Sequence, residues 1–249
     1  MNALTEENTM TLLDSLYKQA ADGIPKVSKP VSELAYDYTK RYPDIDVAIK
    51  KMLRNQVIKC TVTGVMTGLG GAITLPAAIS ADIGSVLYVQ LRMIAVTAYM
   101  SGYELDSDQT KTFVYACLAG VSIDKVLADA GIKFSMKFAE SMIKKIPGEV
   151  LTKINKAVGF RFVTKFGEKG IINLGRMIPA AGGVVGGGFN LAETKLIANR
   201  AYKSFFEADI TAFGDCKEES QFSRDDGILQ GVQDDMADEF VEYEFHGEE

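Results

Sequence analysis

The feature that most constrains the fold is a run of 22 uncharged residues, Cys60 to Ala81, that contains two helix-breaking signals. A helix of that length would be long enough to span roughly 30 Å of hydrocarbon. The Gly70-Gly71 pair and Pro76 should nevertheless break it in the middle, because glycine and proline both disfavour a helix interior. We therefore expect an apolar helical hairpin, either buried in protein or dipped into one leaflet, and not a straight membrane span.

The remainder of the chain also has a helical pattern, because apolar residues recur at three- and four-residue spacing and period-two alternation is scarce. The pattern predicts an all-α fold with one helical domain. Caps, glycines and prolines place the expected helices at residues 6–21, 33–41, 45–69, 76–101, 106–129, 133–145, 149–158 and 179–206. Asp44 should cap the third of these helices, and Asp106 with Gln109 should form a capping box for the fifth.

Glycines are concentrated in the hairpin and in the last expected helix, which we therefore describe as a glycine-rich C-terminal helix. Small residues spaced four apart let helices approach closely, both in membranes and in tightly packed soluble cores, and both readings stay open here. The candidate helix-packing glycines are Gly68, Gly70, Gly71, Gly183 and Gly187.

The C-terminal residues 214–249 are strongly acidic, with 13 acidic and 2 basic side chains. Such a segment repels itself and buries little apolar surface, so we expect a disordered tail that offers a docking site to a protein partner. The expected organisation is an N-terminal amphipathic helix at 1–21, a helical domain at 22–213 and the acidic tail at 214–249.

The middle of the chain is basic, since residues 125–176 hold 11 basic and 4 acidic side chains. A basic stretch favours an anionic surface, although a solvated lysine-rich helix face produces the same pattern. The candidate contacts to an anionic surface are Lys137, Lys144, Lys145 and Lys153.

Signals of catalysis are weak. The single histidine, His246, lies in the acidic tail, which argues against a serine or cysteine nucleophile with a histidine base. The three cysteines are far apart and odd in number, which indicates a reducing compartment and argues against a disulfide framework or a Cys-x-x-Cys metal site. We expect no catalytic residue, metal or cofactor.

The candidates for a buried polar pocket are Asp82, Gln90 and Arg92, since a charge in a very apolar helix normally has a partner or a function.

Several sequence blocks form a recognisable set. The main ones are Val65–Pro76, with its Gly-Gly and Leu-Pro pairs, and Tyr88–Ile94, with Gln-x-Arg-x-Ile. Further blocks are Leu53–Gln56, Val158–Arg161, Lys165–Gly170 and Pro179–Asn190. Together these blocks closely resemble the EcsC protein family. The family is named for a protein encoded beside the subunits of a bacterial ABC transporter, and the resemblance implies no catalytic residue. The same pattern is similar to membrane-associated helical domains attached to some Era-like GTPases.

Together these features predict a non-enzymatic bacterial protein, cytoplasmic and peripheral to the inner membrane. It would act through contacts with lipid or a membrane protein, in connection with an ABC transporter or another membrane-protein process. An amino terminus without the basic start and apolar run of a signal peptide agrees with this location. A soluble cytoplasmic adaptor with an ordinary helical core is the alternative, and an enzyme with a buried Asp/Gln/Arg pocket ranks below both. No nucleic-acid partner is expected.

Overall fold

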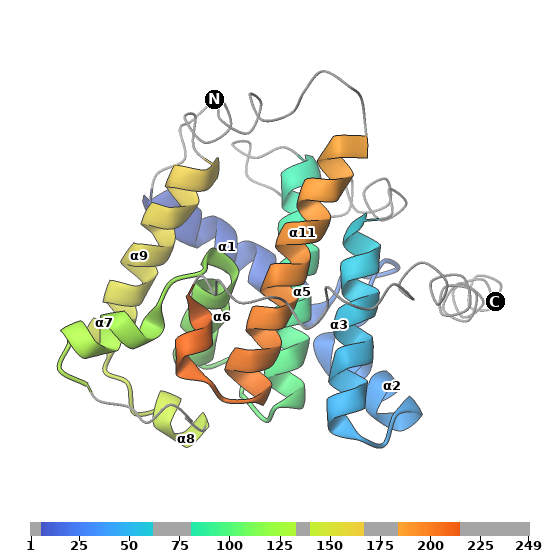
Figure 1. The fold of residues 1–249 in the computed structure, drawn as a ribbon, viewed down its shortest axis with the longest axis horizontal. Helices are drawn as coiled ribbons and strands as arrows, with labels where there is room; N and C mark the ends of the chain where they lie inside the picture. The colour runs from blue at the N-terminus through green and yellow to red at the C-terminus, as the bar shows by residue number, and fades with distance from the viewer. Residues whose placement is uncertain (1–5, 62–80, 133–139, 167–183, 215–249) are drawn as a thin grey trace. The chain divides into compact units, whose positions relative to one another are not determined.

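The computed structural model describes residues 6–61, 81–132, 140–166 and 184–214, all of which belong to one compact unit. The described segments form helices and no β-strand (Figure 1), so the predicted all-α class is confirmed. The N-terminal helix is part of this unit. The hairpin residues 62–80 and the acidic tail from 215 lie outside the described residues.

The fold is built around one central helix, α5 (Ala81–Met100), which packs against five of the other α-helices that the structure describes. Every residue from Leu87 to Ala98 is buried. A helix that is apolar on all sides needs partners on all sides. These partners are α1 (Glu6–Asp22), α2 (Val31–Arg41), α3 (Ile45–Thr61), α6 (Asp108–Ala119) and α11 (Val184–Ala201).

The helices divide into two groups on either side of α5 and α11 (Figure 1). On one side α2 packs against α3, and α3 packs against both α5 and α11. On the other side α9 (Gly148–Phe166) packs against α1, α6 and the short helix α7 (Ile123–Asp129). The single-turn helix α8 (Glu140–Ile143) precedes α9. The outer faces of α9 and of the α2–α3 pair therefore lie at opposite ends of the unit.

The sequence predicted one helix over residues 106–129, which is wrong because the structure has two. The break occurs at Gly120, which takes a left-handed conformation (φ 71°) that glycine adopts without strain and that commonly ends a helix. The Val121 amide then donates to the Ala116 carbonyl at 2.9 Å, which closes the turn. Ser122 precedes the first residue of α7.

One predicted cap is confirmed and the other is wrong. Asp44 Oδ1 accepts hydrogen bonds from the amides of Asp46 (2.8 Å) and Val47 (3.2 Å), as expected for the start of α3. At the start of α6, Ser107 replaces Asp106 as the cap, and its Oγ accepts from the Thr110 amide at 3.2 Å. Both serine and aspartate are good caps, so the sequence alone did not decide between these neighbours.

The last described segment leaves the regular α-helix. After α11 the chain forms a π-helical turn, η1 (Tyr202–Phe206), and a 3₁₀ turn, η2 (Ile210–Phe213). These turns insert two aromatic rings into the core, where Phe213 lies edge-on to Phe113 (5.2 Å between ring centroids) and to Phe205 (5.5 Å). Phe205 in turn meets Tyr103 at 5.3 Å. This aromatic cluster joins the end of the described chain to α6.

Candidate functional site

Gln90 and Arg92, two of the predicted pocket residues, form hydrogen bonds with different neighbours of α5. Gln90 is 2 % exposed, and its Nε2 donates to Thr194 Oγ1 of α11 at 3.1 Å. Arg92 is also buried, and its Nη1 donates to the Ala20 carbonyl at 2.9 Å while its Nη2 donates to the Lys29 carbonyl. Ala20 lies in the last turn of α1, where carbonyls lack helical partners and attract a cation. The guanidinium therefore ties α1 and the α1–α2 connection to α5.

Asp82 completes the predicted set, and its backbone lies in the first turn of α5. Its side chain is outside the described part of the structure. Eight residues of helix separate Asp82 from Gln90, which corresponds to about 12 Å along the axis. Gln90 and Arg92 are two residues apart and so point to different sides of the helix. Gln90 and Arg92 therefore do not share one pocket, and the part that Asp82 takes stays a prediction.

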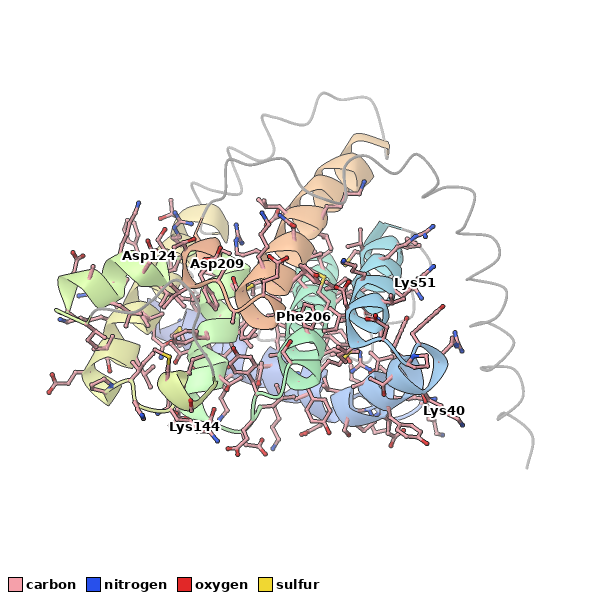
Figure 2. All side chains as sticks on the ribbon, turned by 60° about the horizontal axis from the view of Figure 1, so that its bottom comes forward. Lys40, Lys51, Asp124, Lys144, Phe206 and Asp209 are labelled. Atoms are coloured by element: carbon pink, nitrogen blue, oxygen red, sulfur yellow. The ribbon has the colours of Figure 1, made fainter. Side chains whose placement is uncertain are left out.

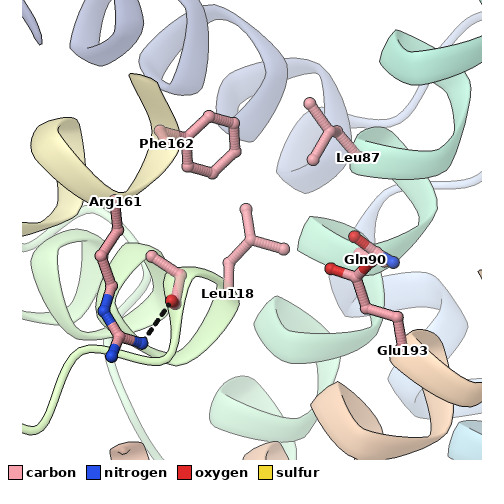
Figure 3. Close-up of a pocket in the computed structure, with 7 residues that line it drawn as sticks. Leu87, Gln90, Leu118, Arg161, Phe162 and Glu193 are labelled. Atoms are coloured by element: carbon pink, nitrogen blue, oxygen red, sulfur yellow. Dashed lines mark hydrogen bonds between the residues drawn. The ribbon is translucent and has the colours of Figure 1, made fainter. Parts of the chain in front are cut away.

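A small hollow does lie beside Gln90, between α5, α6, α9 and α11 (Figure 3). Its space is about large enough for a single water molecule. The lining residues are Leu87, Gln90, Leu118, Ala119, Arg161, Phe162 and Glu193. Among them, the Arg161 guanidinium is turned toward the backbone, where its Nη1 donates to the carbonyls of Ala119 (3.1 Å) and Gly120. The hollow is too small for an organic substrate.

Arg161 and Arg200 have a role that the sequence analysis missed, since both hold the carboxyl end of α6. Arg200, 4 % exposed in α11, donates from Nη1 to the Cys117 carbonyl at 2.7 Å and from Nε to the Gly214 carbonyl at 3.2 Å. With Arg161 it places two cations at the negative end of the α6 dipole. A single arginine among the apolar residues that end α11 was the available signal.

Two lysines of α9 lie on its exposed face. Lys153, Lys156 and Phe160 are all exposed, and their spacing of three and four residues places them on one side of the helix. Phe160 is 62 % exposed, which is unusual for a phenylalanine in a packed helical unit. Lys145 precedes the helix and is also exposed.

The other predicted surface and packing residues are only partly described. Lys144 forms an ion pair with Glu104, with Nζ and Oε1 2.9 Å apart. Lys137, Gly68, Gly70, Gly71 and Gly183 lie outside the described residues. Gly187 falls within α11, which packs against α3 and α5, but the surroundings of Gly187 itself are not described. Close glycine packing in this helix stays a prediction.

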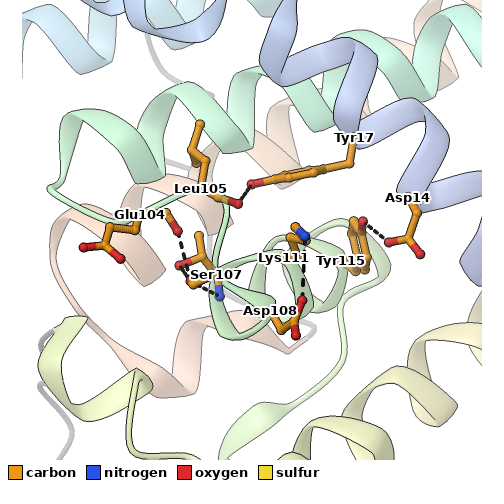
Figure 4. Close-up of polar contacts among 9 residues, drawn as sticks. Asp14, Tyr17, Glu104, Leu105, Ser107, Asp108, Lys111 and Tyr115 are labelled. Carbon is orange, nitrogen blue, oxygen red and sulfur yellow. Dashed lines mark hydrogen bonds and ion pairs between the residues drawn. The ribbon is translucent and has the colours of Figure 1, made fainter.

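A second polar cluster, also missed from the sequence, joins α1 to α6 and to the α5–α6 connection (Figure 4). Tyr17 donates to the Leu105 carbonyl at 2.9 Å, and Tyr115 donates to Asp14 Oδ1 at 2.6 Å. The two rings meet edge-on, with centroids 5.7 Å apart. Burial raises the pKa of both phenols, and for Tyr115 the hydrogen bond to the Asp14 carboxylate raises the pKa further.

These raised pKa values predict that the fold loses stability in alkali. The unfolded chain releases the phenolic protons near the usual pKa of about 10, whereas the folded chain retains them to higher pH. The stabilisation is therefore complete below about pH 10 and is lost as the pH rises further. We expect the Tyr115→Phe variant to lose less stability than the parent protein between pH 9 and 12, measured by urea denaturation. If the stability of both proteins fell equally with pH, the buried Tyr115 phenol would not be a cause of the alkaline loss.

Neither a metal site nor a membrane span is found in the described portions of the chain. No group of three or more histidine, cysteine, aspartate or glutamate side chains there is arranged to hold a metal ion. None of the helices in those portions combines the length and apolar character required to cross a bilayer.

Comparison with known proteins agrees with the sequence blocks described above. The model of the EcsC protein family matches residues 43–206. An "Uncharacterized protein YdbA" from Bacillus subtilis (strain 168) is 28% identical over 168 residues, which are 66% of this chain and 58% of that protein. The chain thus spans less than two thirds of the relative's length. No solved structure matches the chain. Because the family match covers well over half of the 249 residues, the chain belongs to the EcsC protein family.

Proposed function

We propose that this protein binds peripherally to anionic membrane surfaces through the outer face of α9. The observation that carries the proposal is Phe160, an exposed aromatic side chain that shares one helix face with Lys153 and Lys156. Interfacial helices combine these features, since the aromatic ring enters the acyl boundary while the ammonium groups meet lipid phosphates. The location would be the cytoplasmic side of the inner membrane.

Charge supports the proposal further. No carboxylate within the described segments forms an ion pair with Lys145, Lys153 or Lys156. The acidic side chain on the same face is Glu149, at the start of α9. Each lysine near an anionic leaflet contributes about 1 kcal/mol, and a buried phenylalanine about 1.5–3 kcal/mol. Three lysines and Phe160 together contribute about 5 kcal/mol, which corresponds to a sub-millimolar, reversible association.

The buried polar residues have a structural role in this proposal. Gln90 and Arg92 direct hydrogen bonds to neighbouring helices, and the hollow beside Gln90 has no room for a substrate. The protein would therefore act by bringing its surfaces to the membrane and would not catalyse a reaction. A membrane transporter or another membrane-protein process is the setting that we propose for this contact.

Vesicle flotation tests the proposal. The full-length protein should float with vesicles of phosphatidylglycerol and phosphatidylcholine at low salt, and less at high salt, because salt screens the lysines. Phe160→Ser and the double variant Lys153→Gln/Lys156→Gln should each reduce the floated fraction several-fold. Matched controls at the other end of the unit are Tyr36→Ser, with a side chain 63 % exposed, and Lys40→Gln/Lys51→Gln. The role of α9 would be overturned if the α9 variants floated like the parent protein, or if the control variants reduced flotation as much as the α9 variants do.

A further inference from the structure

A second exposed apolar surface lies at the end of the unit opposite α9, on helices α2 and α3. Tyr36 is 63 % exposed, and Ile45 and Val47 are about 40 % exposed. Lys40 follows Tyr36 by four residues, and Lys51 follows Val47 by four, so each helix presents an apolar side chain next to a lysine. We call the outward faces of these two helices the α2–α3 corner and define it as Tyr36, Lys40, Arg41, Val47 and Lys51.

The cations of this corner are available to a partner. The Lys40 ammonium lies 6.0 Å from the centre of the Tyr36 ring, and the Lys51 ammonium lies 6.0 Å from that of Tyr42. Such contacts at exposed positions are weak. Over the residues that the structure describes, no carboxylate forms an ion pair with Lys40, Arg41 or Lys51.

Most acidic side chains of the same helices already have partners. Asp37 pairs with Lys29 at 2.9 Å, and Asp44 caps α3. Asp46 binds Lys50 at 2.8 Å through one oxygen and accepts the Tyr202 hydroxyl at 2.5 Å through the other. Glu33 lies in the first turn of α2, away from the α2–α3 connection. The remaining charge of the corner is positive and adjoins apolar surface.

We propose that the α2–α3 corner is a docking surface for a segment of a second protein that alternates acidic with aromatic or aliphatic residues. Carboxylates of that segment bind Lys40, Arg41 and Lys51, and its apolar side chains cover Tyr36 and Val47. Charge complementarity carries the proposal, together with exposed apolar surface that a partner would remove from water.

The position and charge of the corner distinguish this partner from the other anionic candidates. Lys144 lies shortly before the start of α9, and Lys40 and Lys51 lie at the opposite end of the unit (Figure 2). A bilayer lying on the face of α9 therefore leaves the corner free. Glu33 in α2 and Asp44 just before α3 carry carboxylates that form no ion pair among the described residues, and these disfavour a continuous polyphosphate such as single-stranded nucleic acid. A protein segment with separated carboxylates avoids that repulsion. The inference thus adds a protein partner to the proposed membrane contact and does not depend on it.

A binding assay with a random copolymer of glutamate and tyrosine, labelled with fluorescein, tests the proposal on the full-length protein. Binding measured by fluorescence anisotropy should weaken about tenfold in Lys40→Gln/Lys51→Gln and in Tyr36→Ser/Val47→Ser. The double variant Lys18→Gln/Lys125→Gln, with the same charge change at exposed positions of α1 and α7, should bind the copolymer like the parent protein. Five of the six substituted side chains are exposed and that of Lys51 is half-buried, so nearly unchanged thermal transitions are expected throughout.

Three comparisons complete the test. Polyglutamate, which lacks the aromatic groups, should bind more weakly than the copolymer. Anionic vesicles should bind the corner variants and the parent protein equally. Vesicle or single-stranded DNA binding that falls in the corner variants while copolymer binding persists would show a membrane or nucleic-acid face instead. Copolymer binding that is equal in corner variants and controls, or undetectable in the parent protein, would overturn the docking surface without touching the role of α9.

Discussion

Replacing Arg200 by methionine should lower the free energy of unfolding by about 3 kcal/mol. The substitution leaves two carbonyls, of Cys117 and Gly214, without their charged donor in a region where Arg200 is only 4 % exposed. Hydrogen bonds to charged groups contribute about 1.5–3 kcal/mol each, and the methionine recovers part of that loss by filling the space. Urea denaturation should show a lower midpoint with an unchanged slope, which indicates a change of stability and not of unfolded-state compactness.

Two variants calibrate this result. Arg200→Lys keeps the charge but has no planar fork with which to reach both carbonyls, so its stability should lie between those of the parent and the methionine variant. Arg41→Met removes an exposed arginine and should change stability by less than about 0.5 kcal/mol. If Arg200→Met and Arg41→Met proved equally stable, the guanidinium of Arg200 would not hold the end of α6.

The second large effect is expected at Phe213, where replacement by alanine should destabilise the protein by about 4 kcal/mol. Phe213 has no exposed surface and packs edge-on against Phe113 and Phe205. Alanine removes the buried ring and leaves a cavity, and buried phenylalanines in such settings cost about 3–5 kcal/mol when truncated. Thermal or chemical denaturation of the full-length variant measures the loss.

Phe206 provides the matched control for this aromatic cluster. It lies in the same π-helical turn as Phe205 but is only half-buried, and it makes a tilted contact with Tyr202 at 5.3 Å. Phe206→Ala should therefore cost about 1–2 kcal/mol. A cost at Phe213 no greater than that at Phe206 would mean that the turns after α11 do not complete the core.

Most helices could be predicted from sequence because their signals are local, but the helix expected at 149–158 is α9, which continues to Phe166. Asp44 caps α3 through its own side chain and the next few amides, so its role needs no distant partner. The closing glycine after α1 behaves likewise, since Gly23 takes a φ of 76°. The break at Gly120 was missed because one glycine inside an apolar pattern is also tolerated within a helix, and only the packed structure shows which case applies.

The polar contacts could not be predicted, because they join residues far apart in the chain. Arg200 binds the carbonyl of Cys117, and Tyr115 binds the carboxylate of Asp14. No spacing rule connects such pairs. Gln90 and Arg92 are both buried, and their two-residue separation already indicated that they face different helices. The exposure of Phe160 also required the structure, since in sequence it is one more apolar residue of α9.

The packing of α1 against α9 has a consequence for synthesis on the ribosome. The N-terminal helix buries Leu12, Leu13 and Leu16 in the folded protein, yet one of its partners ends at Phe166. At about 5–20 residues per second, roughly 7 to 30 s pass between emergence of the first helix and emergence of that partner. Throughout this interval the part of α1 that packs against α9 in the folded protein stays exposed. The nascent chain should therefore be a client of chaperones that shield apolar helices, and its early helix should be the segment they hold.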